Sequence, residues 1–196
     1  MEKPFSQACE NNKQPIFNAL KDLLDEVDSV LEIGSGTGQH AVHFASLKPQ
    51  LRWQCCDQAE YLPGIQRWLD DAKLHKLPSP QCFEVNSSPW PQGEFQALFS
   101  ANTLHIMSWP SVEQLFARIA REGQPLQWLW FYGPFNYGGE YTSASNAQFD
   151  AWLKNRDPQS GIRDFEAVNT LAENAGFRLH SDCALPANNR LLIWRR

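Results

Sequence analysis

Long hydrophobic runs are missing from this 196-residue sequence, and basic residues are few. No apolar stretch is long enough to cross a bilayer, so a membrane partner is not expected. The seventeen Lys and Arg residues are scattered and the formal net charge is −5, which argues against a broad surface for nucleic acid. Residues 1–15 show no apolar stretch behind a positive cluster, as a secretory signal would. We therefore expect a cytoplasmic protein.

Cysteines are also scarce, and their number is odd. The chain has five, namely Cys9, Cys55, Cys56, Cys82 and Cys183, without the spacing of metal ligands or redox pairs. Free thiols in a reducing compartment are the simplest interpretation, and no metal site is predicted. Cys55 and Cys56 fall inside an expected strand and are interpreted as buried hydrophobic residues.

The composition is that of a folded protein. Apolar residues make up 42% of the chain and charged residues 20%. Eight Trp and twelve Phe residues indicate a well-filled core or an aromatic-walled pocket. The length suits one α/β domain, so we expect a single domain over residues 1–196.

Apolar periodicity predicts strands alternating with helices. The expected strands cover residues 30–33, 51–56, 81–85, 95–100 and 126–132. The expected helices cover residues 15–24, 40–47, 60–74, 112–119 and 165–175, with Asp164 as the cap of the last one. A strand pair over 177–185 and 190–196 closes the chain. This order requires a mostly parallel sheet with helices on both faces. With its antiparallel last strand, it resembles the seven-stranded, Rossmann-like α/β fold of class I methyltransferases that use S-adenosylmethionine (SAM).

Periodicity weakens between about residues 134 and 163. Gly, Ser, Asn and Asp accumulate there, apart from a short helical stretch near residues 147–153. A polar insertion of this length is typical of a lid or a binding loop. We expect it to contact the acceptor molecule.

Residues 30–38 carry the strongest functional signal, a strand that runs into a glycine-rich turn. Gly34, Gly36 and Gly38 let the backbone turn tightly and approach a ligand, while the following helix presents free amides. A dinucleotide fingerprint would place its third glycine at position 39, where the chain has Gln39. The observed spacing matches a SAM loop instead, although the glycines could also serve only close packing of helix on strand.

Polar residues near the expected strand ends extend this cofactor hypothesis. Glu32 would accept a hydrogen bond from the SAM ammonium group, and Asp57 would accept from the ribose hydroxyls. Asn86 could approach the adenine edge, and Asn102 faces the same crevice by topology. Asp57 as a helix cap and Asn86 as an ordinary turn residue remain alternatives. The residues predicted to bind the cofactor are Lys13, Glu32, Gly34, Ser35, Gly36, Gly38, Gln39, His40, Asp57, Asn86 and Asn102.

Lys13, with Asn12, would close over the methionine carboxylate from the N-terminal arm. An ordinary solvated helix in this position is an equal alternative.

Methyl transfer needs an in-line approach of the acceptor, so orientation alone supplies much of the acceleration. His105, just beyond the fourth strand, is the best candidate for a general base, because its ordinary pKa permits proton transfer near neutrality. A histidine that satisfies nearby backbone groups is the alternative. Tyr132 is predicted to line the acceptor pocket as a second catalytic residue, or else to be a core tyrosine.

The expected lid supplies candidates for contact with the acceptor. They are Asn136, Asn146 and Arg163, with Asn188 from the closing strand pair. Arg163 could bind an anionic acceptor, but an ion pair with Asp157 or Asp164 is favoured, because adjacent Arg and Asp residues commonly tie a loop down. The sequence has no Asn-Pro-Pro-aromatic tetrapeptide, the usual element for methylating nucleobase amines. We therefore expect a small-molecule acceptor.

With these residues placed, the chain resembles an uncharacterised family of SAM-dependent methyltransferase-like proteins, the methyltransferase-like protein twenty-six family. The match covers nearly the whole chain. It rests on Asn12-Lys13-Gln14-Pro15-Ile16, Leu31 to His40, Pro89-Trp90-Pro91, Leu104-His105-Ile106 with Trp109, Tyr132-Gly133-Pro134-Phe135, Ser145-Asn146, Phe149-Asp150, Arg156-Asp157-Pro158, Gly161-Ile162-Arg163-Asp164 and Pro186-Ala187-Asn188-Asn189. Gly34 stands where many relatives have alanine, and Glu84 where the family often has aspartate.

The resemblance implies a class I fold and SAM binding, but no particular substrate. A SAM-dependent methyltransferase is the favoured hypothesis. A non-catalytic SAM-binding or interaction protein of the same fold is the alternative, because fold does not fix function. A nicotinamide-dependent reductase is disfavoured by Gln39.

Overall fold

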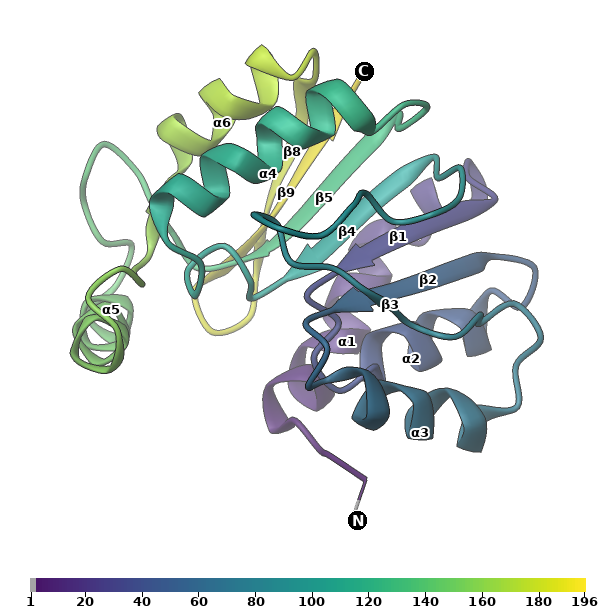
Figure 1. Cartoon of the computed structure of the whole chain (residues 1–196). Coiled ribbons are helices and arrows are strands. Elements are labelled where there is room, and N and C mark those ends of the chain that lie inside the picture. The colour runs from purple at the N-terminus through teal and green to yellow at the C-terminus, as the bar shows by residue number, and fades with distance from the viewer. Residues whose placement is uncertain (1–2) are drawn as a thin grey trace. The chain divides into compact units, whose positions relative to one another are not determined.

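A computed structural model describes residues 3–196 (Figure 1). The strand order is β3-β2-β1-β4-β5-β9-β8, which confirms the predicted seven-stranded, mostly parallel sheet of the Rossmann-like α/β class. The chain forms two compact units that meet in sequence between Ser100 and Ala101. Each unit is described in turn, and their membership in one domain stays a prediction.

The first unit contains four parallel strands. They are β1 (Ser29–Ile33), β2 (Arg52–Asp57), β3 (Gln81–Cys82) and β4 (Ala97–Ala101). The register places Val30 opposite Trp53 on one side and Ala97 on the other. Nearly every residue of β1, β2 and β4 is buried, including the polar Glu32 and Gln54, so these strands show no alternation of buried and exposed residues.

Three helices and a 3-10 turn accompany these strands. They are α1 (Gln7–Leu20), the turn η1 (Leu23–Asp25), α2 (Gln39–Leu47) and α3 (Leu62–Ala72). Phe44 of α2 packs edge-on against Trp53 and Phe99, with ring centroids 5.0 and 5.6 Å apart. Cys55 and Cys56 are fully buried, as predicted. This aromatic cluster fixes α2 on the sheet.

The largest differences from the predicted boundaries in this unit lie in α1 and β3. Helix α1 begins at Gln7 rather than residue 15, and the Ser6 hydroxyl caps it by accepting from the Cys9 amide at 3.2 Å. Pro15, the first residue of the predicted helix, lies inside α1. Strand β3 ends at Cys82 rather than residue 85, because the Glu84 amide donates to the Ser88 hydroxyl and closes a turn.

The second unit is built on an antiparallel arrangement of β5 (Trp128–Gly133), β9 (Asn189–Arg195) and β8 (Arg178–Leu185). Strand β9 pairs antiparallel with both β5 and β8, and the predicted closing strand pair is confirmed. Helices α4 (Trp109–Glu122) and α6 (Phe165–Asn174) lie side by side in this unit (Figure 1). Phe116 of α4 stacks on Phe131 of β5, with ring centroids 5.4 Å apart.

The expected lid segment is more structured than its composition suggested. It holds β6 (Phe135–Asn136) and α5 (Ala144–Arg156), and α5 extends the predicted stretch by about one turn at each end. Strand β6 pairs in parallel with β7 (Arg163–Asp164) to make a separate two-stranded sheet. Asp164 occupies the N-cap position of α6 as predicted, but its side chain makes no capping hydrogen bond.

Among the helices formed by residues 3–196, none combines the length and the hydropathy that a bilayer span requires.

Candidate cofactor and acceptor sites

The glycine turn at residues 34–38 joins β1 to α2. Gly34, Gly36 and Gly38 have φ angles of 74°, 58° and 87°, which side-chain-bearing residues rarely adopt. The Gly34 and Ser35 amides both donate to the Cys56 carbonyl, at 2.9 and 3.1 Å. The turn is therefore tied to the end of β2.

Gly36 and Gly38 have different surroundings in this turn. A Cβ placed on Gly36 would meet no atom within 4 Å, so Gly36 borders open space that a ligand could approach. A Cβ placed on Gly38 would lie 3.2 Å from Ile65 Cγ2, so Gly38 permits close packing of α3. The close-packing interpretation thus applies at Gly38, whereas cofactor binding at Gly36 stays a prediction.

The Asp57 carboxylate lies next to this open space. Its Oδ2 accepts from the Gly36 amide at 2.6 Å, and its Oδ1 accepts from the Gln58 amide at 2.8 Å. Burial raises the pKa of Asp57 above its ordinary value. A carboxylate has about four lone-pair sites, so two remain for further donors.

Glu32 is almost fully buried behind the turn, with 1% of its surface exposed. Its Oε2 accepts from the Trp53 indole N–H at 2.9 Å, and its Oε1 lies 3.8 Å from His40 Nδ1. Burial raises the pKa of Glu32 to about 7. The predicted contact with the SAM ammonium stays a prediction.

Gln39 connects the glycine turn to α1. Its Oε1 accepts from the Ser6 amide at 2.6 Å and from the Thr37 hydroxyl at 2.9 Å. Its Nε2 donates to Glu10 at 3.1 Å. The Gln39 side chain, which was predicted to bind the cofactor, thus holds the start of α1 beside the turn.

His40 makes a second connection to α1. Its Nε2 lies 2.7 Å from Asn12 Oδ1, and burial lowers the pKa of the ring to about 4, so the ring is neutral. Lys13 forms an ion pair with Glu10 on the same helix. Asn86 is exposed in the turn that follows β3. Cofactor binding by His40, Lys13 and Asn86 stays a prediction.

In the second unit, two predicted residues gather at the end of β5. A Cβ placed on Gly133 would lie 3.6 Å from His105 Nδ1 and 3.8 Å from Asn102 Oδ1. Asn102 has a left-handed φ of 58°, and its amide donates to the Tyr132 carbonyl at 2.8 Å. Tyr132 is 5% exposed at the end of the same strand.

The His105 ring is 6% exposed and packs edge-on against Phe149, with ring centroids 5.3 Å apart. Burial, together with the positive charge of Arg163, lowers its pKa to about 4. Across residues 3–196 the ring nitrogens form no hydrogen bond, so the ring does not satisfy a neighbouring backbone group. The role of His105 as a general base stays a prediction.

The contacts of Arg163 differ from those expected from the sequence. Its guanidinium donates to the carbonyls of Leu104 at 3.1 Å and Gln159 at 3.0 Å, and also to that of Met107. The ion pair expected with Asp157 or Asp164 is not formed among the described residues, because these carbonyls engage the guanidinium instead. Arg163 thereby fastens residues 104–107, here called the His105 turn.

Two more bonds hold the His105 turn. The Gly161 amide donates to the His105 carbonyl at 2.9 Å, and the Ser160 hydroxyl donates to the Ile106 carbonyl at 3.0 Å. No sequence motif signals an arginine bound to backbone carbonyls, so this positioning role could not be read from the chain.

The remaining acceptor candidates divide into two kinds. Asn136 is 8% exposed, and its Oδ1 is buried without a partner within residues 3–196. Asn146 Nδ2 instead donates to the Asn188 carbonyl at 3.2 Å, and Asn188 Nδ2 donates to Ser145 Oγ at 3.1 Å. Asn146 and Asn188 thus fasten α5 to the β8–β9 loop, whereas Asn136 keeps an acceptor atom unused.

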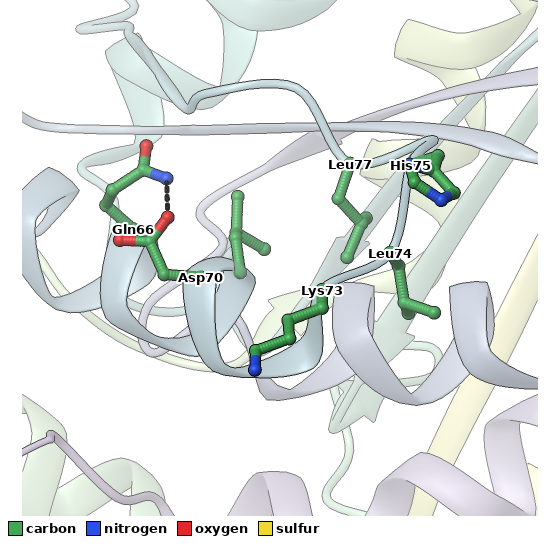
Figure 2. A pocket seen from close by; sticks show the side chains of 7 residues that line it. Gln66, Asp70, Lys73, Leu74, His75 and Leu77 are labelled. Atoms are coloured by element: carbon green, nitrogen blue, oxygen red, sulfur yellow. Dashed lines mark hydrogen bonds between the residues drawn. The ribbon is translucent and has the colours of Figure 1, made fainter.

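A hollow of about 370 Å³ lies beside the end of α3 (Figure 2). Its lining residues are Gln66, Leu69, Asp70, Lys73, Leu74, His75 and Leu77. The nearby Lys76 carbonyl accepts from the Trp53 amide at the start of β2, so the hollow lies at the opposite end of β2 from the glycine turn. The residues predicted for cofactor and acceptor are not among those lining it. In the described part of the chain, no group of three or more His, Cys, Asp or Glu side chains could hold a metal ion.

Comparison with solved structures defines the class of fold. A SAM-dependent methyltransferase named SibL, in its apo form, has a TM-score of 0.79 at 20% identity, covering 96% of this chain and 55% of its own. Human N-acetylserotonin methyltransferase in complex with SAM has a TM-score of 0.77 at 18% identity. The match covers 97% of this chain and 53% of the methyltransferase. A putative O-methyltransferase from Nostoc punctiforme has a TM-score of 0.80 at 16% identity. The match covers 96% of this chain and 56% of the O-methyltransferase. The fold is that of class I SAM-dependent methyltransferases, and the chain spans about half the length of these proteins.

The chain belongs to the DUF938 family, described as proteins of unknown function, which it matches over residues 3–196.

Proposed function

We propose that this protein is a SAM-dependent methyltransferase that acts on a small-molecule acceptor. The observation that carries the proposal is the open space at Gly36, bordered by the Asp57 carboxylate. The class of the structural neighbours supports it, as do neighbours named for small-molecule acceptors, such as N-acetylserotonin. Kinship with methyltransferase-like protein twenty-six is part of the same proposal, and so is a cytoplasmic location, which five free thiols support.

The residues around the turn suit SAM better than a phosphate-bearing cofactor. The turn carries no Lys or Arg, and a carboxylate 2.6 Å from the Gly36 amide would repel a phosphate group. The same carboxylate can accept from ribose hydroxyls, and the buried Glu32 can accept from an ammonium group. When bound, SAM supplies a methyl group activated by its sulfonium.

SAM and its demethylated product should both raise the melting temperature of the protein. At a hundredfold excess over the dissociation constant, a ligand adds about 2.7 kcal/mol to the free energy of unfolding. Asp57→Ala is expected to abolish this shift, because it removes the proposed ribose acceptor and frees the Gly36 amide. Differential scanning fluorimetry measures both effects.

Asp22→Ala is the matched control, since Asp22 is an exposed aspartate of the same unit. This variant should keep the full shift. The proposal fails if neither ligand shifts the unmodified protein at millimolar concentration. Binding without turnover across an acceptor library would instead indicate a non-catalytic SAM-binding protein.

A further inference from the structure

Residues 3–13, here called the N-terminal strap, are attached to α2 and α3 beside the glycine turn. The Ser6 amide donates to Gln39 Oε1 at 2.6 Å, and the same oxygen accepts from the Thr37 hydroxyl of the turn at 2.9 Å. We propose that the strap positions the glycine turn for the cofactor, so that docking of the strap and binding of the cofactor are coupled. The inference rests on the proposed function, because it names an element that controls the same site.

The first residues of the strap are seated on α3. The Trp68 indole N–H donates to the Pro4 carbonyl at 2.6 Å, and the Lys3 ammonium lies 3.9 Å from the centroid of the Trp68 ring. A Cβ placed on Gly64 would lie 2.7 Å from Pro4 Cγ, so glycine at this position leaves room for the strap. A Cβ placed on Gly38 of the turn would lie 3.5 Å from Trp68 Cβ. The strap and the glycine turn therefore pack against the same side chain of α3.

The far end of the strap is held on α2 by buried polar groups. His40 Nε2 lies 2.7 Å from Asn12 Oδ1, and the two residues are 3% and 7% exposed. An amide oxygen can only accept, so the neutral His40 ring donates this bond. The other ring nitrogen, Nδ1, lies 3.8 Å from Oε1 of Glu32 behind the turn. Through His40, the strap is therefore connected to the residue predicted to accept from the cofactor ammonium.

The strap can detach while the rest of α1 stays in place. No apolar side chain within residues 3–13 is buried, whereas Ile16 and Leu20, farther along α1, are fully buried. Pro15, which has no amide hydrogen for a helical bond, lies between the strap and this anchored end. A segment with few buried apolar contacts opens at a low cost in free energy. The strap is thus an element with a docked and an undocked state.

Docking of the strap and binding of the cofactor therefore favour each other. Gln39 and His40 begin α2 directly after the turn, so their bonds to the strap restrict the backbone that borders the open space at Gly36. When a ligand binds only the docked state, its apparent dissociation constant rises as the docked fraction falls. By linkage, the ligand stabilises the docked strap by the same factor.

Gly64→Ala tests this coupling from a position outside the glycine turn. The added methyl group would displace Pro4, while alanine is a better helix former than glycine, so α3 itself is not weakened. Isothermal titration calorimetry of the full chain with SAM should show binding weakened about three- to tenfold. Asn12→Ala, which releases the far end of the strap from His40, should have a similar effect. Asn11→Ala, at the neighbouring exposed position of α1, should leave SAM binding unchanged.

Hydrogen exchange of the Cys9 and Glu10 amides reports the docking itself. Both amides donate to Ser6, at 3.2 and 3.1 Å, and Ser6 is bonded to Gln39. At about a hundredfold excess over its dissociation constant, SAM should slow their exchange in the unmodified protein about tenfold or more. A strap that only supports the fold would exchange at the same rate with and without SAM.

The melting temperature of each variant without ligand reports folding, and the SAM melting shift of the unmodified protein reports the cofactor site. If SAM gives that shift while Gly64→Ala keeps the full affinity, the coupling is wrong and the proposed function stands. Weaker binding in Asn12→Ala alone, with exchange unaffected by SAM, would indicate direct contact of Asn12 with the cofactor and also overturn the coupling. If SAM gives no shift in the unmodified protein, the proposed function is wrong and the coupling fails with it.

Discussion

Glu32→Gln is expected to stabilise the protein by about 3 kcal/mol at pH 8 and by less than about 1 kcal/mol at pH 5. The cause is the buried carboxyl, whose pKa rises from 4.5 to about 7 on folding. Between these values the folded chain binds more protons than the unfolded chain, so stability falls as pH rises. The amide introduced by the substitution would stay neutral throughout while keeping an oxygen for the Trp53 indole.

Urea unfolding of both proteins at pH 5, 6, 7 and 8 measures the effect. His40 and His105, whose pKa values fall to about 4, change stability in the opposite sense, gained as pH rises from about 4 to their ordinary value of 6.5. That contribution is common to both proteins, so the difference between them isolates Glu32. A difference that does not change with pH would show that Glu32 does not titrate in this window.

Asp150→Ala should lower the free energy of unfolding by about 3 kcal/mol, because one partner of a buried network is removed. Asp150 is 2% exposed, and its Oδ1 accepts from the Ile162 amide at 2.7 Å. Its Oδ2 accepts from the Tyr141 hydroxyl and pairs with Lys154, both at 2.6 Å. Lys154 and Tyr141 can turn to water, whereas the Ile162 amide would be left buried and unpaired.

The pH dependence of this network has the opposite sign to that of Glu32. Burial alone would raise the pKa of Asp150, but hydrogen bonds from Lys154, Tyr141 and Ile162 outweigh it and lower the pKa. The stabilisation is therefore present above the ordinary pKa of 3.8 and is lost as pH falls through the folded value. Urea unfolding at pH 7 tests the main effect, with Asn155→Ala expected within about 0.5 kcal/mol of the unmodified protein. A loss of less than about 1 kcal/mol in the free energy of unfolding of Asp150→Ala would contradict the expected contribution of this network to stability.

The sequence predicts the sheet well because buried strands have a clear pattern. Residues 30–33 and 51–56 are mostly apolar, as a covered parallel strand requires, and both segments contain strands in the structure. Strands β6 and β7 were not predicted, because two residues cannot display an alternating pattern. The early start of α1 was missed because residues 7–14 are mostly polar and show no apolar periodicity.

The glycine turn was predictable because its backbone conformation demands glycine. Gly34, Gly36 and Gly38 have left-handed φ angles, which favour glycine over other residues. The turn can therefore be recognised from the spacing of its glycines in the sequence. Polar residues such as Gln39 and Arg163 gave no comparable signal, because their partners are distant in sequence and are known only once the chain is folded.

The place of β9 in the sheet has a consequence for the order in which the chain can fold. Strand β5 is complete by Gly133, yet its antiparallel partner comes from residues 189–195. Until those residues emerge from the ribosome, β5 presents unpaired backbone groups and the side chains of Trp128, Trp130 and Phe131. The second unit is therefore most exposed to aggregation during its own synthesis.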